Sequence, residues 1–291
     1  MFIVNPAAGK GAAKALIEPL HRRLETSGLN YDIVISRSKG QIESLAAQAL
    51  RADYNELIAV GGDGTLTEMI QGIYKMNPMN IIAGTLPCGT GNDFSKVLYS
   101  TQDPLSILEI IIAGASKQVD LINCNGMPCI NVCAMGIDGP ILLDTEKIKR
   151  FIPGPAAYLI STIKSLLRYK ARKVEIIIDQ HSIERTTLII AVGNGRYFGG
   201  GMKITPLAEI DDQLLDVCIV NKVSKVKLLS VFPSIFKGEH LKVKEVEYFK
   251  CSEINVNSLD QSLLLNIDGN IVGTTPAKIT MAKSKIYFYC E

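Results

Sequence analysis

The 291-residue sequence has no long hydrophobic run and no strong excess of either charge. Its longest apolar stretches, such as Ile107–Ala115, stay well short of the roughly 20 residues that a membrane-spanning helix needs. The chain opens on a strand-and-turn pattern, without the basic region and cleavage site of a secretory signal. We therefore expect a soluble globular protein without a transmembrane segment that is not exported.

Regular cysteine spacing and a basic composition are also lacking. The seven cysteines form neither a CxxC pair nor a Cys/His pattern suited to zinc, and Cys129 and Cys133 have no second pair to complete a metal site. A net charge of +2 argues against a nucleic-acid-binding protein, which is normally markedly basic. The three histidines lie in no motif and receive no role. The expected setting is a reducing cytoplasm, with the cysteines as small buried hydrophobic residues.

Strands and helices alternate over the first 122 residues. Short apolar runs such as Leu57–Val60 are separated by helical patterns such as Ala12–Ser27 and Gln41–Ala52. This alternation predicts a mainly parallel sheet covered by helices on both faces, and the unbroken apolar runs suit strands that are buried on both sides. We therefore expect an α/β domain over residues 1–122.

The pattern changes after residue 122. Short runs with partial two-residue alternation follow one another, separated by polar or Gly/Pro turns, and helical patterns interrupt them at Ala156–Tyr169 and Lys225–Phe236. Such runs are typical of an antiparallel sandwich or barrel. The second domain is predicted to span residues 123–291, with a cleft between the two domains.

Three glycine-rich turns follow predicted strands of the first domain, at Asn5–Gly11, Gly61–Thr65 and Leu86–Phe94. Glycines directly after a buried strand bring backbone N–H groups up to a ligand, and a helix that begins at Thr65 favours an anion at its N-terminus. Ligands of an open α/β sheet lie beyond the carboxyl ends of its strands. The three turns together predict one phosphate-binding nucleotide site, although any one of them alone is equally compatible with a structural role.

Neither common nucleotide-binding fingerprint is present, because GxxxxGK[ST] is missing and no GxGxxG is followed about 20 residues later by an acid on a second strand. Two carboxylates, Asp63 and Asp93, lie inside the turns instead. An acid beside a phosphate is repulsive unless a cation lies between them, so this pair predicts a metal-bridged triphosphate. The alternative for Asp63 is a helix cap.

The motifs NPAAGKG, GGDGTLTE and PCGTGNDF, followed by residues 199–217 and the late NIDGN, resemble in that order those of the bacterial diacylglycerol kinase family of lipid kinases. The resemblance covers essentially the whole chain. GGDGT alone is shared with NAD kinases, whereas the PxGTGND turn and the late DG motif are more specific to the lipid kinases. The family implies an N-terminal α/β nucleotide domain, a C-terminal β-sandwich domain, and ATP bound in the cleft.

The resemblance also implies roles for individual residues. Asp63, Asp93 and Asp120 would form an acidic network around a catalytic Mg²⁺. Asp268 would be the base that accepts the proton of the lipid hydroxyl. The implied ATP-binding residues are Asn5, Pro6, Ala7, Ala8, Gly9, Ser36, Gly61, Gly62, Asp63, Gly64, Thr65, Glu68, Gly89, Thr90 and Asn92.

A structural Mg²⁺ is implied at the EIDDQLLD segment, held by the side chain of Asp212 and the backbone carbonyls of Glu209 and Leu214. Oxygen ligands and retained waters suit this ion. The chain has Gln213 where the family usually has glycine, so the alternative of two exposed acids at a hairpin stays open.

Two other positions depart from the family pattern. Thr67 replaces an asparagine, and its hydroxyl can partly substitute for the lost amide. Asn270 replaces the glutamate of the usual DGE motif. Because an amide takes up no proton at neutral pH, an essential glutamate at this position would mean an impaired enzyme.

Residues 153–173 predict an amphipathic helix that ends in a basic cluster. Such a helix can lie on an anionic membrane, or its apolar face can pack on the sandwich with the basic side chains in water. The apolar face comprises Tyr158, Leu159, Ile163, Leu166 and Leu167, and the basic residues are Lys164, Arg168, Lys170, Arg172 and Lys173.

The sequence thus favours a kinase that uses ATP and Mg²⁺ to phosphorylate the hydroxyl of a diacylglycerol-like lipid at a membrane surface. The protein would be cytoplasmic and peripheral at the inner membrane surface, with a homodimer as an open alternative. One other candidate is a kinase of a soluble acceptor such as NAD. Another is a nucleotide-binding regulatory protein without turnover, which Asn270 motivates.

Overall fold

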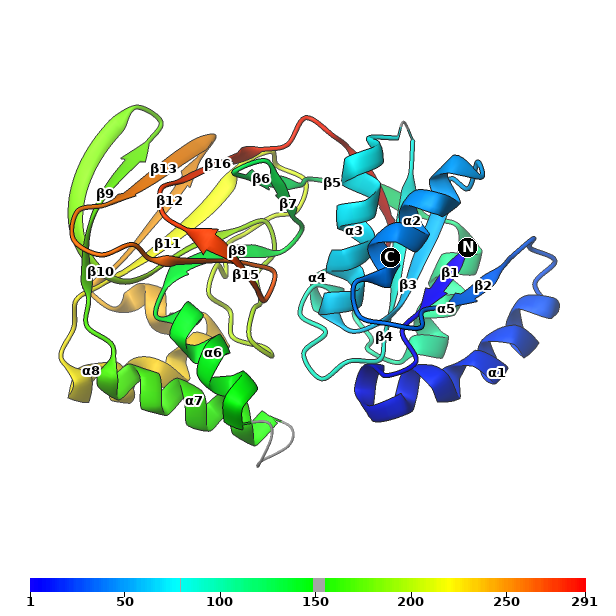
Figure 1. Cartoon of the computed structure of the whole chain (residues 1–291), viewed down its shortest axis with the longest axis horizontal. Helices are drawn as coiled ribbons and strands as arrows, with labels where there is room; N and C mark the ends of the chain where they lie inside the picture. The colour runs from blue at the N-terminus through cyan, green and yellow to red at the C-terminus, as the bar shows by residue number, and fades with distance from the viewer. Residues whose placement is uncertain (79, 149–154) are drawn as a thin grey trace. The chain divides into compact units, whose positions relative to one another are not determined.

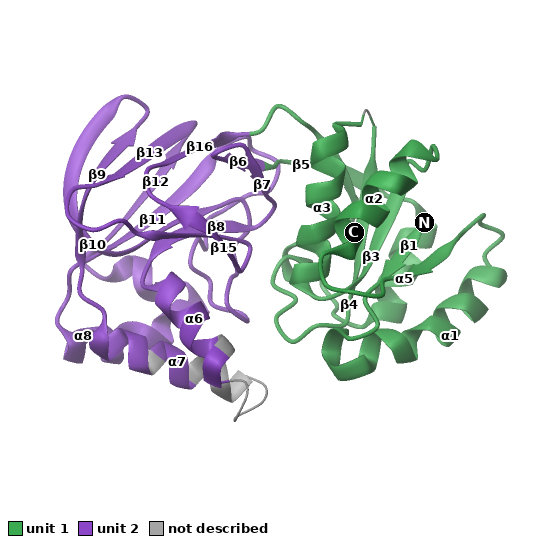
Figure 2. Ribbon diagram, viewed as in Figure 1, with its two compact units in different colours: residues 1–121, 282–291 green, residues 122–281 purple. Residues whose placement is uncertain are grey.

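The computed structural model describes residues 1–78, 80–148 and 155–291 (Figure 1). The chain divides into two compact units (Figure 2). Unit 1 comprises residues 1–121 and 282–291, and unit 2 comprises residues 122–281.

Unit 1 is built on a six-stranded sheet with the strand order β2-β1-β3-β4-β17-β5. All neighbouring strands are parallel except β5, which runs antiparallel to β17. The predicted α/β unit with a mainly parallel sheet is therefore confirmed. The strands are β1 (Phe2–Val4), β2 (Ile33–Ile35), β3 (Glu56–Gly61), β4 (Ile82–Pro87), β5 (Ser116–Val119) and β17 (Ile286–Tyr289).

The helices of unit 1 connect these strands, and their apolar faces turn to the core. Helix α3 buries Leu66, Met69 and Ile73 at helical spacing. It packs closely on α2, since a Cβ on Gly72 would lie only 2.4 Å from the carbonyl oxygen of Glu43, and Figure 1 shows the two helices side by side. The helices are η1 (Ala8–Gly11), α1 (Ala12–Glu25), α2 (Gln41–Arg51), α3 (Asp63–Met76), α4 (Ser95–Leu98) and α5 (Pro104–Ala113).

The last ten residues belong to unit 1, although the sequence pattern assigns them to a second domain of residues 123–291. Strand β17 inserts between β4 and β5. Phe288 is fully buried there and packs edge-on against Phe94, with ring centroids 5.4 Å apart. Two-residue alternation shows that a strand has a buried face, but it does not show which sheet a strand far along the chain will join.

Unit 2 contains an eleven-stranded antiparallel sheet that folds over one apolar core. The long strand β10 (His181–Gly193) pairs with β9 over its first half and with β8 and β11 over its second. Ile176, Ile190 and Val217 meet in the enclosed core, which agrees with the predicted sandwich. The other strands are β6 (Ile122–Cys124), β7 (Met127–Cys129), β8 (Val132–Gly136), β9 (Arg172–Ile178), β11 (Leu215–Asn221), β12 (Val246–Cys251), β13 (Glu253–Ser258), β14 (Leu264–Ile267), β15 (Asn270–Thr274) and β16 (Ala277–Met281).

Helices gather beside this sheet and enclose a second apolar core (Figure 1). The two helical patterns predicted from the sequence appear as α7 and as α8, which continues into η2. Helix α6 is not predicted, because its opening Asp-Gly-Pro looks like a turn, yet proline is tolerated in the first turn of a helix. The helices are α6 (Asp138–Ile148), α7 (Pro155–Arg168), α8 (Lys225–Val231), η2 (Phe232–Lys237) and η3 (Glu239–Lys242).

Candidate functional site

The three glycine-rich turns of unit 1 pack against one another, backbone to backbone. Gly9 has a left-handed φ of 59°, and a Cβ there would lie 1.9 Å from the carbonyl oxygen of Cys88. A Cβ on Gly89 would lie 2.6 Å from the Cα of Gly62. No side chain fits at these contacts without a shift of the backbone. The three turns therefore meet in the structure of unit 1, as their positions after parallel strands predict.

Asn5 links the first turn to the beginning of α3. Its side-chain amide donates to Thr65 Oγ1 at 3.2 Å, and its Oδ1 accepts the N–H of Ala7 at 3.2 Å. Gly61 leaves space for this threonine, since a Cβ on Gly61 would lie 2.2 Å from Thr65 Oγ1. Pro6 and Ala8 complete the turn, in which the Ala8 N–H donates to the Asn5 carbonyl at 3.1 Å. The first turn is therefore held rigidly by Asn5.

Asp63 ties the second turn to the third and does not cap its own helix. Its Oδ1 accepts the backbone N–H groups of Asp93 at 2.7 Å and Phe94 at 3.3 Å. The residue before it, Gly62, is the N-cap of α3 and contributes no side-chain bond, while Gly64 is exposed in the first helical turn. The helix-cap alternative for Asp63 therefore does not apply.

Asp63 and Asp93 form a pair of carboxylates beside Gly91. Their Oδ2 atoms lie 2.8 Å and 3.7 Å from the position that a Cβ on Gly91 would take. Burial, and then the charge of Asp93, raise the pKa of Asp63 to about 6. Lys96 lies 3.0 Å from Asp93 Oδ1 and also donates to the Gly91 carbonyl at 2.7 Å. Two neighbouring carboxylates are a donor set that a divalent cation would stabilise.

The third turn is closed by Asn92, which has a left-handed φ of 51°. Its Oδ1 accepts the Gly89 N–H at 2.9 Å, and its amide donates to the Gly89 carbonyl at 3.0 Å. The neighbouring Thr90 is exposed at the tip of the turn. Asn92 thus shapes the turn, whereas Thr90 presents its hydroxyl to solvent or a ligand.

Two further predicted residues are Ser36, which follows β2, and Glu68, which lies on α3. Ser36 is buried, and its N–H donates to the Val4 carbonyl at 2.8 Å. Glu68 Oε1 accepts the Gly40 N–H at 3.2 Å, while its buried Oε2 has no hydrogen-bond partner among the described residues. A buried acceptor of this kind suits a ligand hydroxyl. Thr67 donates its hydroxyl back to the Asp63 carbonyl at 3.0 Å, so it is engaged within the helix.

Asp120 is buried directly after β5. Across residues 1–78, 80–148 and 155–291, no three acidic, histidine or cysteine side chains are grouped closely enough to hold a metal ion. The structure brings Asp63 and Asp93 together, and the membership of Asp120 in the acidic network stays a prediction.

Asp268 is held by four donors in unit 2. Its Oδ1 accepts the N–H groups of Asn131 and Val132, both at 3.0 Å, and the thiol of Cys129 at 3.2 Å, and its Oδ2 accepts the Ile130 N–H at 2.9 Å. Burial raises the pKa of Asp268, and the donors act in the opposite sense. Only Oδ2 retains an unused lone-pair direction towards a further proton donor.

The backbone conformation at position 268 also favours aspartate. Asp268 and Gly269 have φ of 46° and 85° and connect β14 to β15, as in a type I′ hairpin turn, which favours Asp-Gly. Asn270 follows and is exposed. This motif therefore combines a turn that the hairpin needs with a carboxylate fixed in one orientation.

At the predicted structural metal site, Lys250 lies beside Asp212, a contact that the sequence pattern does not indicate. Asp212 Oδ1 accepts the Leu214 N–H at 3.0 Å, while Lys250 donates to Asp212 Oδ2 at 2.6 Å. Gln213 adopts a left-handed φ of 60°, the conformation in which glycine is usual, and the side chain of Glu209 is exposed.

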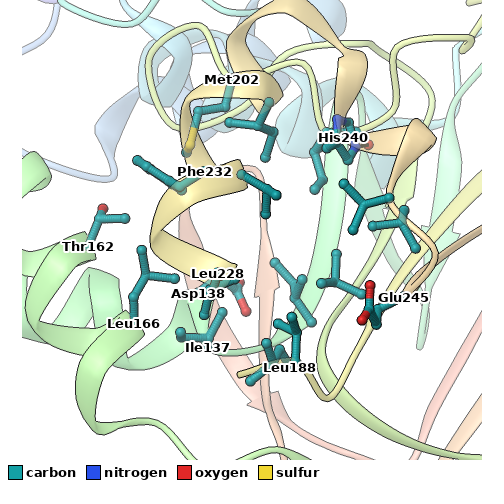
Figure 3. Close-up of a pocket in the computed structure, with 18 of the residues that line it drawn as sticks. Ile137, Asp138, Thr162, Leu166, Leu188, Met202, Leu228, Phe232, His240 and Glu245 are labelled. Carbon is teal, nitrogen blue, oxygen red and sulfur yellow. Dashed lines mark hydrogen bonds between the residues drawn. The ribbon is translucent and has the colours of Figure 1, made fainter. Parts of the chain in front are cut away.

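Unit 2 also contains an apolar cavity of about 100 Å³, which the sequence did not predict (Figure 3). It lies between the second half of β10 and the helices α6, α7, α8 and η2. Apolar side chains make up most of its wall, among them Ile137, Leu166, Leu188, Met202, Leu228 and Phe232.

Two buried titratable side chains, Asp138 and His240, reach the wall of this cavity. Asp138 makes no hydrogen bond of good geometry with the described residues, and burial raises its pKa to about 6. His240 bonds through Nε2 to the Ile204 carbonyl at 3.1 Å, its Nδ1 has no partner in the described part of the chain, and burial lowers its pKa. Only the fold reveals them, because neither belongs to a glycine-rich or acidic motif.

The predicted amphipathic helix is only partly confirmed by the described side chains. Leu166 is buried against the second core, whereas Leu167 is 42% exposed. Lys164 pairs with Asp144 at 2.8 Å, and Arg172 and Lys173 belong to β9, so the basic cluster is divided between two elements. Residues 153 and 154, and the side chains of Tyr158, Leu159 and Ile163, lie outside the described part. Within the described residues, no helix has the length and apolar character needed to cross a membrane.

Two family models match the chain. Residues 1–124 match the diacylglycerol kinase catalytic domain, and residues 131–288 match the YegS C-terminal NAD kinase beta sandwich-like domain. A diacylglycerol kinase of Staphylococcus carnosus is 32% identical over 289 residues, which cover 99% of this chain and 94% of that protein. A diacylglycerol kinase of Staphylococcus aureus is 33% identical over 276 residues, which cover 95% and 87%.

Solved structures share the fold over the same extent. A diacylglycerol kinase from Bacillus anthracis superimposes with a TM-score of 0.78 at 21% identity, covering 100% of this chain and 96% of that one. An NAD kinase from Archaeoglobus fulgidus, solved in complex with ATP, gives a TM-score of 0.55 at 14% identity, covering 99% and 92%. The similarity therefore extends over both units.

Proposed function

The chain belongs to the diacylglycerol kinase family, and from this premise we propose that it transfers the γ-phosphoryl group of ATP to the hydroxyl of a diacylglycerol-like lipid. Relatives at about 32% identity over nearly the full chain bear the name diacylglycerol kinase. The observation that carries the proposal is the convergence of three glycine-rich turns around the Asp63–Asp93 pair. Backbone N–H groups and paired acids at one place are what a metal-bound nucleotide requires.

ATP is proposed to bind at these turns, with its phosphates beside Gly62 and Gly89. Side chains are excluded there by the close contact of the two backbones. Glu68 Oε2, a buried acceptor without a partner among the described residues, is suited to a nucleotide hydroxyl. The Archaeoglobus NAD kinase, which shares the fold, was solved with ATP, and this supports ATP as the nucleotide.

Mg²⁺ fits the Asp63–Asp93 pair. In phosphoryl-transfer enzymes this ion commonly takes one or two carboxylates together with substrate phosphates, and a third protein ligand is not needed. Asp63 Oδ2 and Asp93 Oδ2 are the candidate ligands, since Asp63 Oδ1 already accepts two backbone N–H groups. When bound, the ion would neutralise the phosphate charge as it develops.

Asp268 is proposed to accept the proton of the acceptor hydroxyl. Its four donors fix the carboxylate, so Oδ2 is preoriented with one lone pair to spare. Burial raises its pKa above that of an ordinary aspartate, which makes it a stronger base. Asn270 cannot share the role. The proposal requires the acceptor bound to unit 2 to meet the nucleotide bound to unit 1.

The apolar cavity of unit 2 is proposed to receive part of an acyl chain at a membrane surface. The segment 225–237 is apolar on both sides, because Leu228 and Phe232 line the cavity while Val226 and Phe236 are 82% and 46% exposed. Exposed apolar side chains flanked by lysines suit the surface of an anionic bilayer. A cytoplasmic protein peripheral to the inner membrane surface would meet its lipid in this way.

Transfer of labelled phosphate from ATP to diacylglycerol in mixed vesicles tests the proposal. The expected result is labelled lipid that depends on Mg²⁺, with the protein cosedimenting with anionic vesicles. Labelling of NAD alone would favour the soluble-acceptor alternative, and ATP binding without any labelled product would favour a regulatory protein. Sedimentation velocity on the same preparation determines whether the protein is a homodimer.

A further inference from the structure

Lys250 lies beside Asp212, the one side chain that the family pattern implies as a ligand of a structural metal ion. Its Nζ lies 2.6 Å from Asp212 Oδ2 and 3.7 Å from Asp216 Oδ2. Lys250 on β12 stands directly opposite Asp216 on β11 in the antiparallel register. The ammonium group is therefore delivered to the turn by two paired strands, whose register fixes its position.

Asp216 requires a positive charge at this place. It is fully buried, its Oδ1 accepts the hydroxyl of Tyr248 at 2.8 Å, and its Oδ2 has no hydrogen-bond partner in the described part of the chain. A buried carboxylate without a nearby cation is strongly destabilising, and Lys250 supplies that cation.

The side chains at the turn do not fit a resident Mg²⁺. One oxygen of Asp212 accepts the Leu214 N–H, and the other is bonded by Lys250. Of the three implied ligands only Asp212 would contribute a charged oxygen, because Glu209 and Leu214 would contribute backbone carbonyls. A divalent cation beside Asp212 would also be repelled by the ammonium group.

We propose that Lys250 takes the place of the structural metal and fixes the 209–214 turn to the sheet of unit 2 by bridging Asp212 and Asp216. Gln213 retains the left-handed turn that glycine usually provides, so the turn keeps its shape. The stability of unit 2 is then independent of divalent cations. This inference concerns folding alone and does not depend on the proposed kinase activity.

Thermal unfolding of the nucleotide-free, full-length protein in EDTA and in MgCl₂ provides the test. The wild type and Asp212→Asn should show the same shift in unfolding temperature between the two media, whatever the Asp63–Asp93 pair contributes to both. Lys250→Met should unfold at a lower temperature in EDTA, and Mg²⁺ should recover part of the loss, because removal of the ammonium leaves two carboxylates for the ion. Lys250→Arg keeps a cation and should respond to Mg²⁺ no more than the wild type does.

Lys278→Met is the matched control. Lys278 forms a 3.1 Å ion pair with Glu253 on the same sheet but is largely exposed, so its loss should leave the response to Mg²⁺ as it is in the wild type. The proposal fails if chelation destabilises the wild type and Asp212→Asn abolishes that effect. It also fails if Lys250→Met is destabilised and Mg²⁺ recovers nothing, since Lys250 would then be an ordinary ion pair.

Direct Mn²⁺ binding, followed by electron paramagnetic resonance, decides the question if Lys250→Met does not fold. The wild type and Asp212→Asn should bind equal numbers of Mn²⁺ ions, whatever the Asp63–Asp93 pair contributes to both. One ion fewer in Asp212→Asn would overturn the proposal.

Discussion

The two acidic turns that were expected to hold Mg²⁺ differ in the position of the nearest lysine side chain. In unit 2, Lys250 lies near both Asp212 and Asp216, and the turn is closed by its own backbone. In unit 1, Lys96 pairs with Asp93 Oδ1 and the Gly91 carbonyl, while the Oδ2 atoms of Asp63 and Asp93 face glycine backbone. Acidic residues alone therefore do not define a metal site. What matters is whether the chain itself supplies the cation and whether glycine leaves room for a ligand.

Replacing the proposed base should have the largest effect on activity. Asp268→Asn keeps the shape of the side chain but removes the proton acceptor, which typically costs about 10²- to 10⁴-fold in rate. ATP affinity, measured by calorimetry, should hardly change. Because Asp268 also accepts four donors, the melting temperature must be measured alongside, so that loss of fold is not taken for loss of chemistry.

Asn270→Glu provides the companion variant. It restores the carboxylate of the usual family motif at an exposed position and should leave turnover similar or raise it. Full activity of Asp268→Asn on a lipid acceptor would refute the base assignment. An inactive parent that Asn270→Glu activates would instead support the regulatory reading.

Removing the aromatic side chain of β17 should be the largest perturbation of stability and should act on unit 1. Phe288 is fully buried and packs on Phe94. Phe288→Ala should lower the free energy of unfolding by about 3–5 kcal/mol, as truncation of a buried phenylalanine usually does. Chemical denaturation measures the loss. Tyr287→Ala, on the less buried side of the same strand, should cost clearly less, and equal losses would contradict the assignment of β17 to the core of unit 1.

The sequence predicts unit 1 better than unit 2 for a physical reason. Alternating strands and helices and glycine turns are local patterns, so the meeting of Gly62 and Gly89 follows from parallel strands that end at one edge. The pairing of Lys250 with Asp212 joins segments 38 positions apart, and β17 joins strands much further away. Those contacts depend on strand register and sheet topology, which local periodicity does not reveal.

The cavity of unit 2 shows the same limit. Asp138 and His240 belong to helices packed on the sheet, and neither stands in a recognisable motif. Helix α6 itself begins with residues that favour a turn. The candidate lipid-binding features could therefore be found only from the folded chain, whereas most candidate ATP-binding residues could be named beforehand.

A branched side chain at the second glycine turn should impair nucleotide binding. Gly62→Val places a Cβ 3.0 Å from the Cα of Gly89 and further methyl groups where phosphates are proposed to lie, so ATP affinity should fall at least about 100-fold. Gly64→Val is the companion variant. Nothing lies within 4 Å of a Cβ at Gly64, so this change adds a side chain without disturbing internal packing and tests ligand contact alone. Equilibrium binding of ATP measures both. Unchanged affinity in both variants would mean that the turn is purely structural.

The smallest expected effect concerns pH and compares one buried carboxylate from each unit. Asp63 and Asp138 both have a pKa raised to about 6, chiefly by burial, from an ordinary value of 3.8. Between these values the folded state binds more protons than the unfolded state, so stability falls as pH rises from about 4 to 6, by roughly 2–3 kcal/mol for each group.

Asp63→Asn and Asp138→Asn should each flatten the curve of unfolding free energy against pH. Added Mg²⁺ should offset the loss above pH 6 in the wild type and in Asp138→Asn but not in Asp63→Asn, because only Asp63 is proposed to face the ion. An equal response to Mg²⁺ in all three proteins would remove Asp63 from the metal site.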